Sequence, residues 1–341
     1  MSRFNVKRML VVMAGLLAAI AVAEATDISG AGATFPYPVY SKWADAYKQQ
    51  TGIGLNYQSI GSGGGIKQIK AKTVTFGASD MPLEQKDLEQ AGLVQFPMII
   101  GGVVPVVNIK GIQGGQMVLD GPTLAAIYLG EITTWDDARI RKLNPKLALP
   151  SAAIAPIYRS DGSGTNFLFS TYLSSSYPKF KDTIGANTSV QWPVGIGAKG
   201  NEGVANMTTQ TDGGIGYVEY AYAKQNKMAY TDLINSAGQR VTPDAVSFQA
   251  AAASADWANA PGYHLILTNQ PGAKSWPITG ASFILLYGVP PDPAATGAAL
   301  KFFDWAYTNG GKMAADLDYV PLPDSVIKLV RATWKSQIKG L

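Results

Sequence analysis

Residues 157–169 place several side chains that can bind an oxyanion around one glycine-rich turn. The stretch reads Ile-Tyr-Arg-Ser-Asp-Gly-Ser-Gly-Thr-Asn-Phe-Leu-Phe, and its pattern predicts a strand at 154–158, a turn and then a helix. The first amides of a helix have no intrahelical acceptor, and the helix dipole adds partial positive charge there. Ser163 and Thr165 add hydroxyl donors, and Gly164 lets the backbone approach a ligand closely. The turn is therefore a candidate anion site.

Arg159 and Asp161 extend this candidate site. The guanidinium of Arg159 can present a planar fork of donors to a tetrahedral oxyanion. The carboxylate of Asp161, two residues further on, could hold that fork in place. On this segment alone, an ordinary capped helix beside a surface arginine explains the pattern equally well.

Two further turns repeat the same design in the first quarter of the chain. Gly32-Ala-Thr34-Phe35 and Gly61-Ser62-Gly63-Gly64 each follow a strand-like run and begin a helix. The carboxyl ends of parallel strands meet at one edge of a sheet, so these turns are expected to converge with the turn near Arg159 on one small anion. Because the turns come from distant parts of the chain, the site is expected to lie between two lobes.

Asp80 follows another predicted strand and needs a separate explanation. A carboxylate repels anions, so a simple role as the cap of the helix behind Pro82 is one interpretation. The other depends on hydrogen-bond direction, because an ionised carboxylate can only accept. It favours an oxyanion that still carries a proton, as phosphate does near neutral pH and sulfate does not. Asp80 would then select phosphate over sulfate.

Strand-like and helix-like segments alternate from residue 27, which predicts an α/β protein with a largely parallel sheet. The Gly/Ser/Asn-rich stretch 174–203 is expected to be mainly loop, and the Ala-rich stretch 249–260 to be helical. The other predicted strands are 27–33, 55–59, 73–78, 97–107, 214–218 and 283–288. The other predicted helices begin near 36, 66 and 82 and cover 122–129, 136–143, 166–173, 295–307 and 325–338.

The first 23 residues have the pattern of a cleavable secretory signal peptide. Three basic residues precede an uncharged apolar run at 9–23, which is shorter than the ~20 residues that a membrane span needs. Ala21-Val22-Ala23 fits the cleavage rule and would leave Glu24 as the first mature residue, with Ala25 as a second possible end of the signal. The mature chain then has 25 basic and 24 acidic residues, a net charge of +1. This balance gives no support for nucleic-acid binding.

Several catalytic and cofactor-binding classes are excluded or disfavoured by composition. The chain has no cysteine, which excludes disulfides and a thiol nucleophile, and His264 is its single histidine, so an ordinary zinc or copper site is not expected. His264 lies far from any nucleophile motif and is interpreted as a packing residue. Residues 195–200 match the dinucleotide pattern G-x-G-x-x-G, but without a long preceding strand. No enzyme activity, cofactor or metal is predicted.

Taken together, the motifs resemble one family along essentially the whole mature chain. The motifs are Ser-Gly-Ala-Gly-Ala-Thr-Phe-Pro (29–36), Gly-Ser-Gly-Gly-Gly (61–65), Phe-Gly-Ala-Ser-Asp (76–80), Arg-Ser-Asp-Gly-Ser-Gly-Thr (159–165), Gly-Ile-Gly-Tyr-Val-Glu-Tyr (214–220) and Tyr-Leu-Gly-Glu-Ile-Thr-Thr-Trp (128–135). In this order they resemble the periplasmic phosphate-binding proteins of high-affinity phosphate ABC transporters.

The resemblance implies a type II periplasmic binding protein fold with two α/β lobes and phosphate in the cleft. One lobe would comprise residues 24–103 and 277–341, and the other residues 104–276. The implied partners are inorganic phosphate and the membrane permease, and the protein is expected to be a periplasmic monomer. The phosphate ligands that the resemblance implies are Thr34, Phe35, Ser62, Asp80 as acceptor, Arg159, Ser163, Gly164 and Thr165, with Asp161 supporting Arg159.

Two other functions remain open at this point. One is a secreted phosphatase or phosphoryl-transfer enzyme that uses the same anion cradle, although no metal cluster or general base beside a nucleophile is apparent in the sequence. The other is a binding protein for a different oxyanion such as sulfate, or a phosphate scavenger that serves adhesion or sensing.

Overall fold

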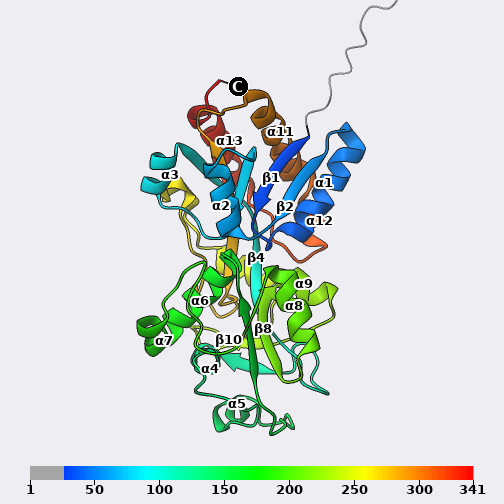
Figure 1. Cartoon of the computed structure of the whole chain (residues 1–341), viewed down its shortest axis with the longest axis vertical. Coiled ribbons are helices and arrows are strands. Elements are labelled where there is room, and N and C mark those ends of the chain that lie inside the picture. Colours follow the sequence, from blue (N-terminus) through cyan, green and yellow to red (C-terminus); the bar gives the residue numbers. More distant parts are fainter. Residues whose placement is uncertain (1–26, 341) are drawn as a thin grey trace, which may run out of the picture.

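The protein has two α/β lobes, one above the other in Figure 1, and one long strand runs between them. The computed structural model describes residues 27–340, and the predicted signal peptide lies outside the described residues. The long strand is β4 (Leu93–Val107), which is buried along its whole length. It pairs with β12 (Thr279–Tyr287) as far as Gly102 and with β8 (Gly214–Glu219) from Val103 onward. The two lobes therefore share one continuous sheet.

This sheet has the strand order β2-β1-β3-β12-β4-β8-β6-β7, and β9 pairs with β4 beside this path. Its outer strands are parallel in each lobe, whereas β12 and β4 are antiparallel to their neighbours. The expectation of a largely parallel sheet is therefore correct for the outer strands and wrong for the two central ones. The remaining strands of this sheet are β1 (Ile28–Gly32), β2 (Leu55–Ser59), β3 (Phe76–Ser79), β6 (Ala155–Arg159), β7 (Ile196–Ala198) and β9 (Ala229–Tyr230).

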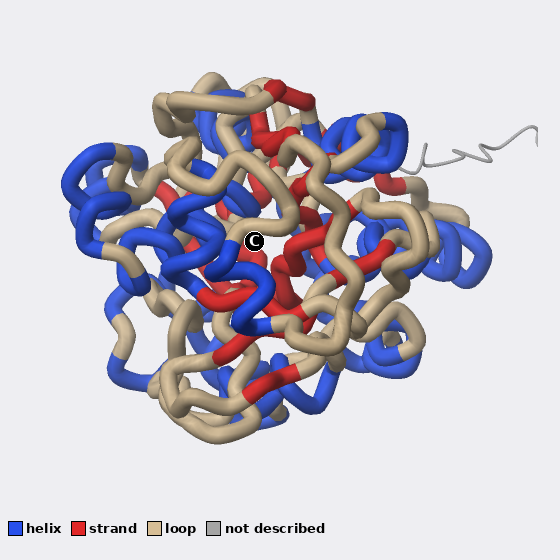
Figure 2. Tube along the Cα trace, turned by 90° about the horizontal axis from the view of Figure 1, so that it is seen from below, coloured by secondary structure: helices blue, strands red, loops and turns tan. Residues whose placement is uncertain are grey.

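Helices cover the sheet in both lobes, and Figure 2 shows strands at the centre with helices and loops outside. The upper lobe carries α1 (Tyr37–Thr51), α2 (Ser62–Lys70), α3 (Gln85–Ala91), α11 (Pro293–Asn309), α12 (Gly311–Ala315) and α13 (Asp324–Gln337). The lower lobe carries α4 (Gly121–Tyr128), α5 (Ala138–Leu143), α6 (Gly164–Ser176), α7 (Pro178–Thr183), α8 (Gly200–Gln210) and α9 (Tyr220–Gln225). A further helix, α10 (Ala245–Ala252), and a small sheet of β5 (Val118–Asp120), β10 (Asp232–Ile234) and β11 (Arg240–Val241) complete the fold.

Most predicted elements are present, and two predictions were wrong. Stretch 174–203 was expected to be mainly loop but contains α7, β7 and the start of α8. The helix predicted at 249–260 begins earlier, at Ala245, because Asp244 and Ser247 form a capping box. It ends at Ala252, and only a short 3₁₀ turn (Trp257–Asn259) follows.

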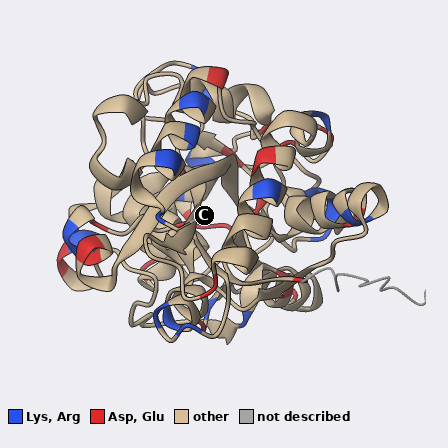
Figure 3. Cartoon of the chain, turned by 90° about the horizontal axis from the view of Figure 1, so that it is seen from above, with Lys and Arg blue, Asp and Glu red and all other residues tan. Residues whose placement is uncertain are grey.

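Aromatic side chains fill the core of both lobes, and most charged side chains lie outside it. In the lower lobe the rings of Phe169 and Tyr217 stack at a centroid distance of 4.0 Å. In the upper lobe the ring of Phe76 meets that of Phe303 edge to face at 5.0 Å. Figure 3 shows charged residues of both signs spread over the helices. Within residues 27–340, no helix is both long and apolar enough to cross a membrane.

Gly65 sets how closely α2 can approach the sheet, and through α2 it positions Ser62. A Cβ atom at Gly65 would lie 2.5 Å from Cα of Gly32 and 2.8 Å from the carbonyl oxygen of Ala78. Both contacts are with backbone, which cannot rotate away. Gly65→Ala is therefore expected to lower the free energy of unfolding by about 1–3 kcal/mol, as overpacking does, in urea denaturation followed by circular dichroism.

Gly64→Ala is the matched control on the same helix. There the new methyl group would meet the side chain of Ile60, 2.9 Å away, which can change rotamer. Because alanine also favours helix over glycine by up to about 1 kcal/mol, this variant is expected to be neutral or slightly stabilised. Equal losses for both variants would contradict the close-packing explanation.

Candidate functional site

The predicted site residues lie together where the outer strands end and helices begin. Thr34 and Phe35 lie between β1 and α1, Ser62 is the first residue of α2, and Asp80 directly follows β3. In the lower lobe Arg159 is the last residue of β6, and residues 163–165 form the start of α6. The three turns thus converge as expected from the carboxyl ends of parallel strands. The side chains of this group are buried: Thr34 2%, Ser62 0%, Asp80 2%, Arg159 3%, Ser163 0% and Thr165 0% exposed.

A bidentate ion pair between Arg159 and Asp161 organises the lower half of the site. Nε of Arg159 donates to Oδ1 of Asp161 at 2.8 Å, and Nη2 donates to Oδ2 at 2.6 Å. Burial opposes ionisation of Asp161, but Arg159 and the amide of Gly200 outweigh it and hold the pKa of Asp161 below its ordinary value. Nη1 of Arg159 is buried and has no hydrogen-bond partner among residues 27–340. The guanidinium is therefore fixed in orientation while one donor group remains available.

Backbone and side-chain contacts join the two lobes at Ser62. Its hydroxyl accepts from the amide of Gly164 at 3.0 Å and from the amide of Asp80 at 3.1 Å. One residue further, the amide of Gly63 donates to the carbonyl oxygen of Gly162 at 2.8 Å. A Cβ atom at Gly164 would lie 2.5 Å from Oδ2 of Asp80, so only glycine fits between the lobes at this position.

Asp80 is the buried acceptor of the site. Burial raises its pKa from the ordinary value to about 7, although Ser282, Arg159 and Ser62 act in the opposite direction. Oδ2 accepts a long hydrogen bond of 3.4 Å from Ser62, while the part of the chain that the structure describes provides no partner for Oδ1. A buried carboxylate oxygen without a donor is costly, so Oδ1 is suited to a proton donor supplied by a ligand.

The pKa of Asp80 makes a prediction about stability in the absence of added phosphate. Between the unfolded value of 3.8 and the folded value of about 7, the folded protein holds a proton that the unfolded chain has lost, so ionisation of Asp80 lowers stability as pH rises. Asp80→Asn removes this effect. From pH 5 to pH 8 the stability of the variant relative to wild type is expected to increase by about 2–3 kcal/mol, measured by denaturant unfolding.

Asp182→Asn, which changes an exposed carboxyl group on α7, is the control for this measurement. Its stability relative to wild type should be nearly the same at both pH values. A flat pH dependence for Asp80→Asn as well would show that Asp80 is ionised across this range in the ligand-free protein.

Four helix N-termini border the site, and one of them was not anticipated. Helices α1, α2 and α6 were expected there, whereas α8 falls in the stretch predicted to be loop. Its first residue, Gly200, donates its amide to Oδ1 of Asp161 at 3.0 Å. Its second residue, Asn201, is fully buried and hydrogen-bonds to the hydroxyls of Thr34 and Thr165. Because Arg159 and Asp161 compensate each other, helix termini and oriented hydrogen-bond donors provide much of the attraction for an anion.

The sequence contained one signal for Asn201. Ile196-Gly-Ala-Lys-Gly-Asn has the same order of strand, glycine and helix start as the three predicted turns. In the sequence this segment stands out only through the pattern G-x-G-x-x-G, because β7 is three residues long and too short to be recognised from its composition.

Glu219 and Tyr319 form a second buried polar contact behind Phe35. Oη of Tyr319 lies 2.6 Å from the carbonyl oxygen of Phe35 and 2.7 Å from Oε2 of Glu219. A phenol has one hydrogen and can donate it to only one of these acceptors. A protonated Glu219 would supply the second hydrogen, and burial, which raises the pKa of Glu219 well above its ordinary value, favours that form.

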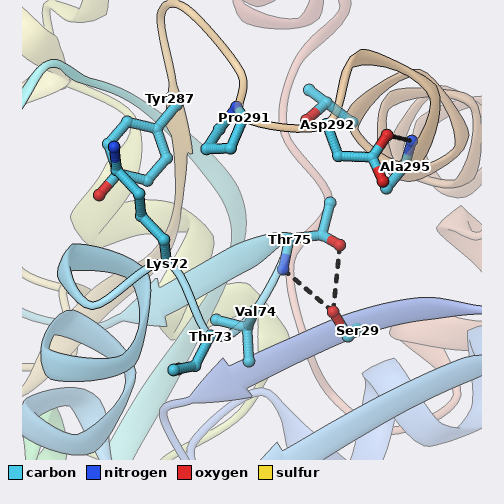
Figure 4. Close-up of a pocket in the computed structure, with 10 residues that line it drawn as sticks. Ser29, Lys72, Thr73, Val74, Thr75, Tyr287, Pro291, Asp292 and Ala295 are labelled. Carbon is cyan, nitrogen blue, oxygen red and sulfur yellow. Dashed lines mark hydrogen bonds between the residues drawn. The ribbon is translucent and has the colours of Figure 1, made fainter.

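A pocket at the far end of the upper lobe is separate from this site (Figure 4). Its polar groups pair with one another: Ser29 contacts Thr75 at 3.1 Å, and Asp292 caps α11 through the amide of Ala295 at 3.0 Å. Lys72 lies over the ring of Tyr287, 5.4 Å from its centroid.

Among the residues that the structure describes, no group of three or more His, Asp or Glu side chains could hold a metal ion.

Comparisons with known proteins identify the fold. The PBP superfamily domain matches residues 19–309. Among solved structures, a high affinity periplasmic phosphate-binding protein bound with phosphate has a TM-score of 0.70 at 21% identity, covering 90% of this chain and 93% of that one. A phosphate binding protein from Stenotrophomonas maltophilia has a TM-score of 0.68 at 24% identity, covering 90% and 94%. The fold is thus that of the two-lobed periplasmic binding proteins.

Curated relatives define the family more narrowly. The phosphate-binding protein PstS of Xylella fastidiosa (strain 9a5c) is 54% identical over 316 residues, which cover 93% of this chain and 87% of the relative. The protein of the same name from Methanocaldococcus jannaschii is 34% identical, with coverage of 87% and 83%. The chain belongs to the PstS family of phosphate-binding proteins. It is accordingly a solute-binding protein and not an enzyme.

Proposed function

We propose that this protein binds inorganic phosphate between its two lobes in the periplasm and delivers it to the membrane permease of a phosphate ABC transporter. The proposed ligands are Thr34, Phe35, Ser62, Asp80, Arg159, Ser163, Gly164 and Thr165, with Asp161 holding Arg159 in place. The relatives' names and the bound phosphate in the similar structure support phosphate as the ligand.

The main support for the proposal is the presence of two buried groups, one a hydrogen-bond donor and the other an acceptor. Nη1 of Arg159 is a donor and Oδ1 of Asp80 an acceptor, and neither has a partner within residues 27–340. An unprotonated oxygen of phosphate can accept from Arg159. One proton can be shared between phosphate and Asp80, whichever of the two carried it before binding. Sulfate brings no such proton, so above the pKa of Asp80, where the carboxylate is ionised, it would place a lone pair against the acceptor.

Binding phosphate and then delivering it to the permease requires the two lobes to move relative to each other. We assign residues 24–103 and 277–341 to one lobe and residues 104–276 to the other, because β4 changes partner between Gly102 and Val103. Within the second range, residues 257–263 pack back on α3 and α13 of the first lobe. Phosphate contacts both lobes only when they are closed, so its differential affinity favours the closed form. The closed form would be the one that docks on the permease. The signal peptide would direct export and be cleaved after Ala23, and the mature protein would act as a monomer.

Calorimetric titration of phosphate, and separately of sulfate, into ligand-stripped mature protein tests this function. We expect one phosphate per chain at pH 6 and at pH 8. Sulfate is expected to give no heat at pH 8, where Asp80 is ionised, and to bind more tightly at pH 6, where Asp80 holds a proton that it can donate. In Asp80→Asn the amide can donate to sulfate, so the ratio of sulfate to phosphate dissociation constants is expected to fall at least about tenfold. Arg159→Lys, which cannot reproduce the bidentate fork, should weaken phosphate binding about tenfold or more without changing this ratio as strongly.

Comparable binding of sulfate and phosphate by the wild-type protein would leave a general oxyanion receptor and contradict the role of Asp80. Absence of phosphate binding at millimolar concentration would contradict the proposed function altogether. Tight phosphate binding in a protein whose loss leaves phosphate uptake by the cell unchanged would favour scavenging or sensing over transport.

A further inference from the structure

Asn201 connects one hydroxyl group from each lobe. Its Nδ2 lies 2.6 Å from Oγ1 of Thr34 and 3.1 Å from Oγ1 of Thr165. Its backbone amide also donates to Oγ1 of Thr34, at 3.2 Å. Thr34 belongs to the turn before α1 in the upper lobe, and Thr165 and Asn201 belong to α6 and α8 in the lower lobe.

The orientation of the Asn201 amide follows from a third contact. Oδ1 accepts from the backbone amide of Glu219 at 2.8 Å. A backbone N–H can only donate, so the amide oxygen must face Glu219 and the NH₂ group must face the threonines. The two hydrogens of Nδ2 are thus directed to the two hydroxyl oxygens. Asn201, 0% exposed, is fixed in place by these contacts.

This arrangement determines what each threonine hydroxyl can do. Oγ1 of Thr34 receives two hydrogen bonds, which occupy both of its lone pairs. Its hydrogen must then be donated elsewhere, and among residues 27–340 no hydrogen bond donated by this hydroxyl is found. Thr165 receives one hydrogen bond from the same amide, so it is also biased to donate away from Asn201. Both hydroxyls are buried at the start of the helices that border the site.

We infer that Asn201 is a positioning residue that turns the hydroxyl hydrogens of Thr34 and Thr165 toward the bound anion. The inference rests on the proposed function and deepens it. Asp80 presents an acceptor to the protonated oxygen, and Asn201 ensures that the two threonines present only donors to the other oxygens. Because Asn201 binds a residue of each lobe, this donor set is complete only when the lobes are closed.

The alternative is that Asn201 has a purely structural role as the acceptor for the Glu219 amide. Asn201→Asp separates these roles, because an aspartate keeps the acceptor for Glu219 and replaces the NH₂ donor by an oxygen. The threonine hydroxyls would then donate to this carboxylate and turn away from the anion. The added charge also weakens anion binding, so the effect must be measured as a coupling between residues.

Double-mutant cycles measure this coupling by calorimetric phosphate titration. One cycle combines Asn201→Asp with Thr34→Val, and the other combines it with Thr165→Val. In the wild-type background each valine is expected to weaken phosphate binding about tenfold or more, because a donor to the anion is lost. In the Asn201→Asp background the same valine should change affinity less than about threefold, since the hydroxyl no longer faces the anion. The added charge is present in both arms and cancels.

Equal effects of each valine in both backgrounds would overturn the inference and leave Asn201 with a structural role. Asn201→Ala adds no charge and no acceptor, so it is expected to reduce each valine effect less than Asn201→Asp does. Thermal unfolding of every variant shows that the protein is folded. If wild type does not bind phosphate, the proposed function fails. If wild type binds phosphate and no coupling is found, only the role of Asn201 fails.

Discussion

The arrangement of the site depends on the buried ion pair between Arg159 and Asp161. A buried guanidinium without a partner would be strongly destabilising, so Asp161 makes it possible to keep Arg159 away from solvent. The same carboxylate accepts the amide of Gly200 and thereby fixes the start of α8. It also lies against the upper lobe, because a Cβ atom at Gly61 would be 2.3 Å from its Oδ2. One side chain thus determines the orientation of the guanidinium, the place of a helix and the contact between lobes.

Discrimination among tetrahedral anions in such a site is a matter of hydrogen-bond direction more than of charge. Sulfate and doubly charged phosphate have similar size and the same net charge. The two anions differ in whether one of their oxygens carries a hydrogen. A site that fixes every donor and one acceptor before the anion arrives makes a mismatch costly. Each buried polar group that is left unpaired weakens binding by about 1–3 kcal/mol. Rigidity of the polar network is therefore part of specificity.

The sequence was sufficient to predict the convergence of the three turns, because glycine-rich turns after strands have a local signature. Burial of Asp80 and Arg159 in one cluster followed from the same topology, and the resemblance added the family. Asn201 and the Glu219–Tyr319 contact were not predicted. The contacts of Asn201 with Thr34 and of Tyr319 with Glu219 join residues 167 and 100 positions apart, and no local pattern encodes these two pairings. The antiparallel pairing of β4 with β12 was missed for the same reason, as it joins residues far apart in the chain.

The position of β12 has a consequence for how the protein folds. This strand comes from residues 279–287, yet it lies in the middle of the upper sheet, between β3 (Phe76–Ser79) and β4. The upper sheet therefore cannot be completed until nearly the whole chain is available, whereas β6, β7 and β8 of the lower lobe come from residues 155–219. Pairing over such separations is slow. A newly made chain would thus remain without its upper lobe for most of its synthesis, which would suit the export proposed for this protein.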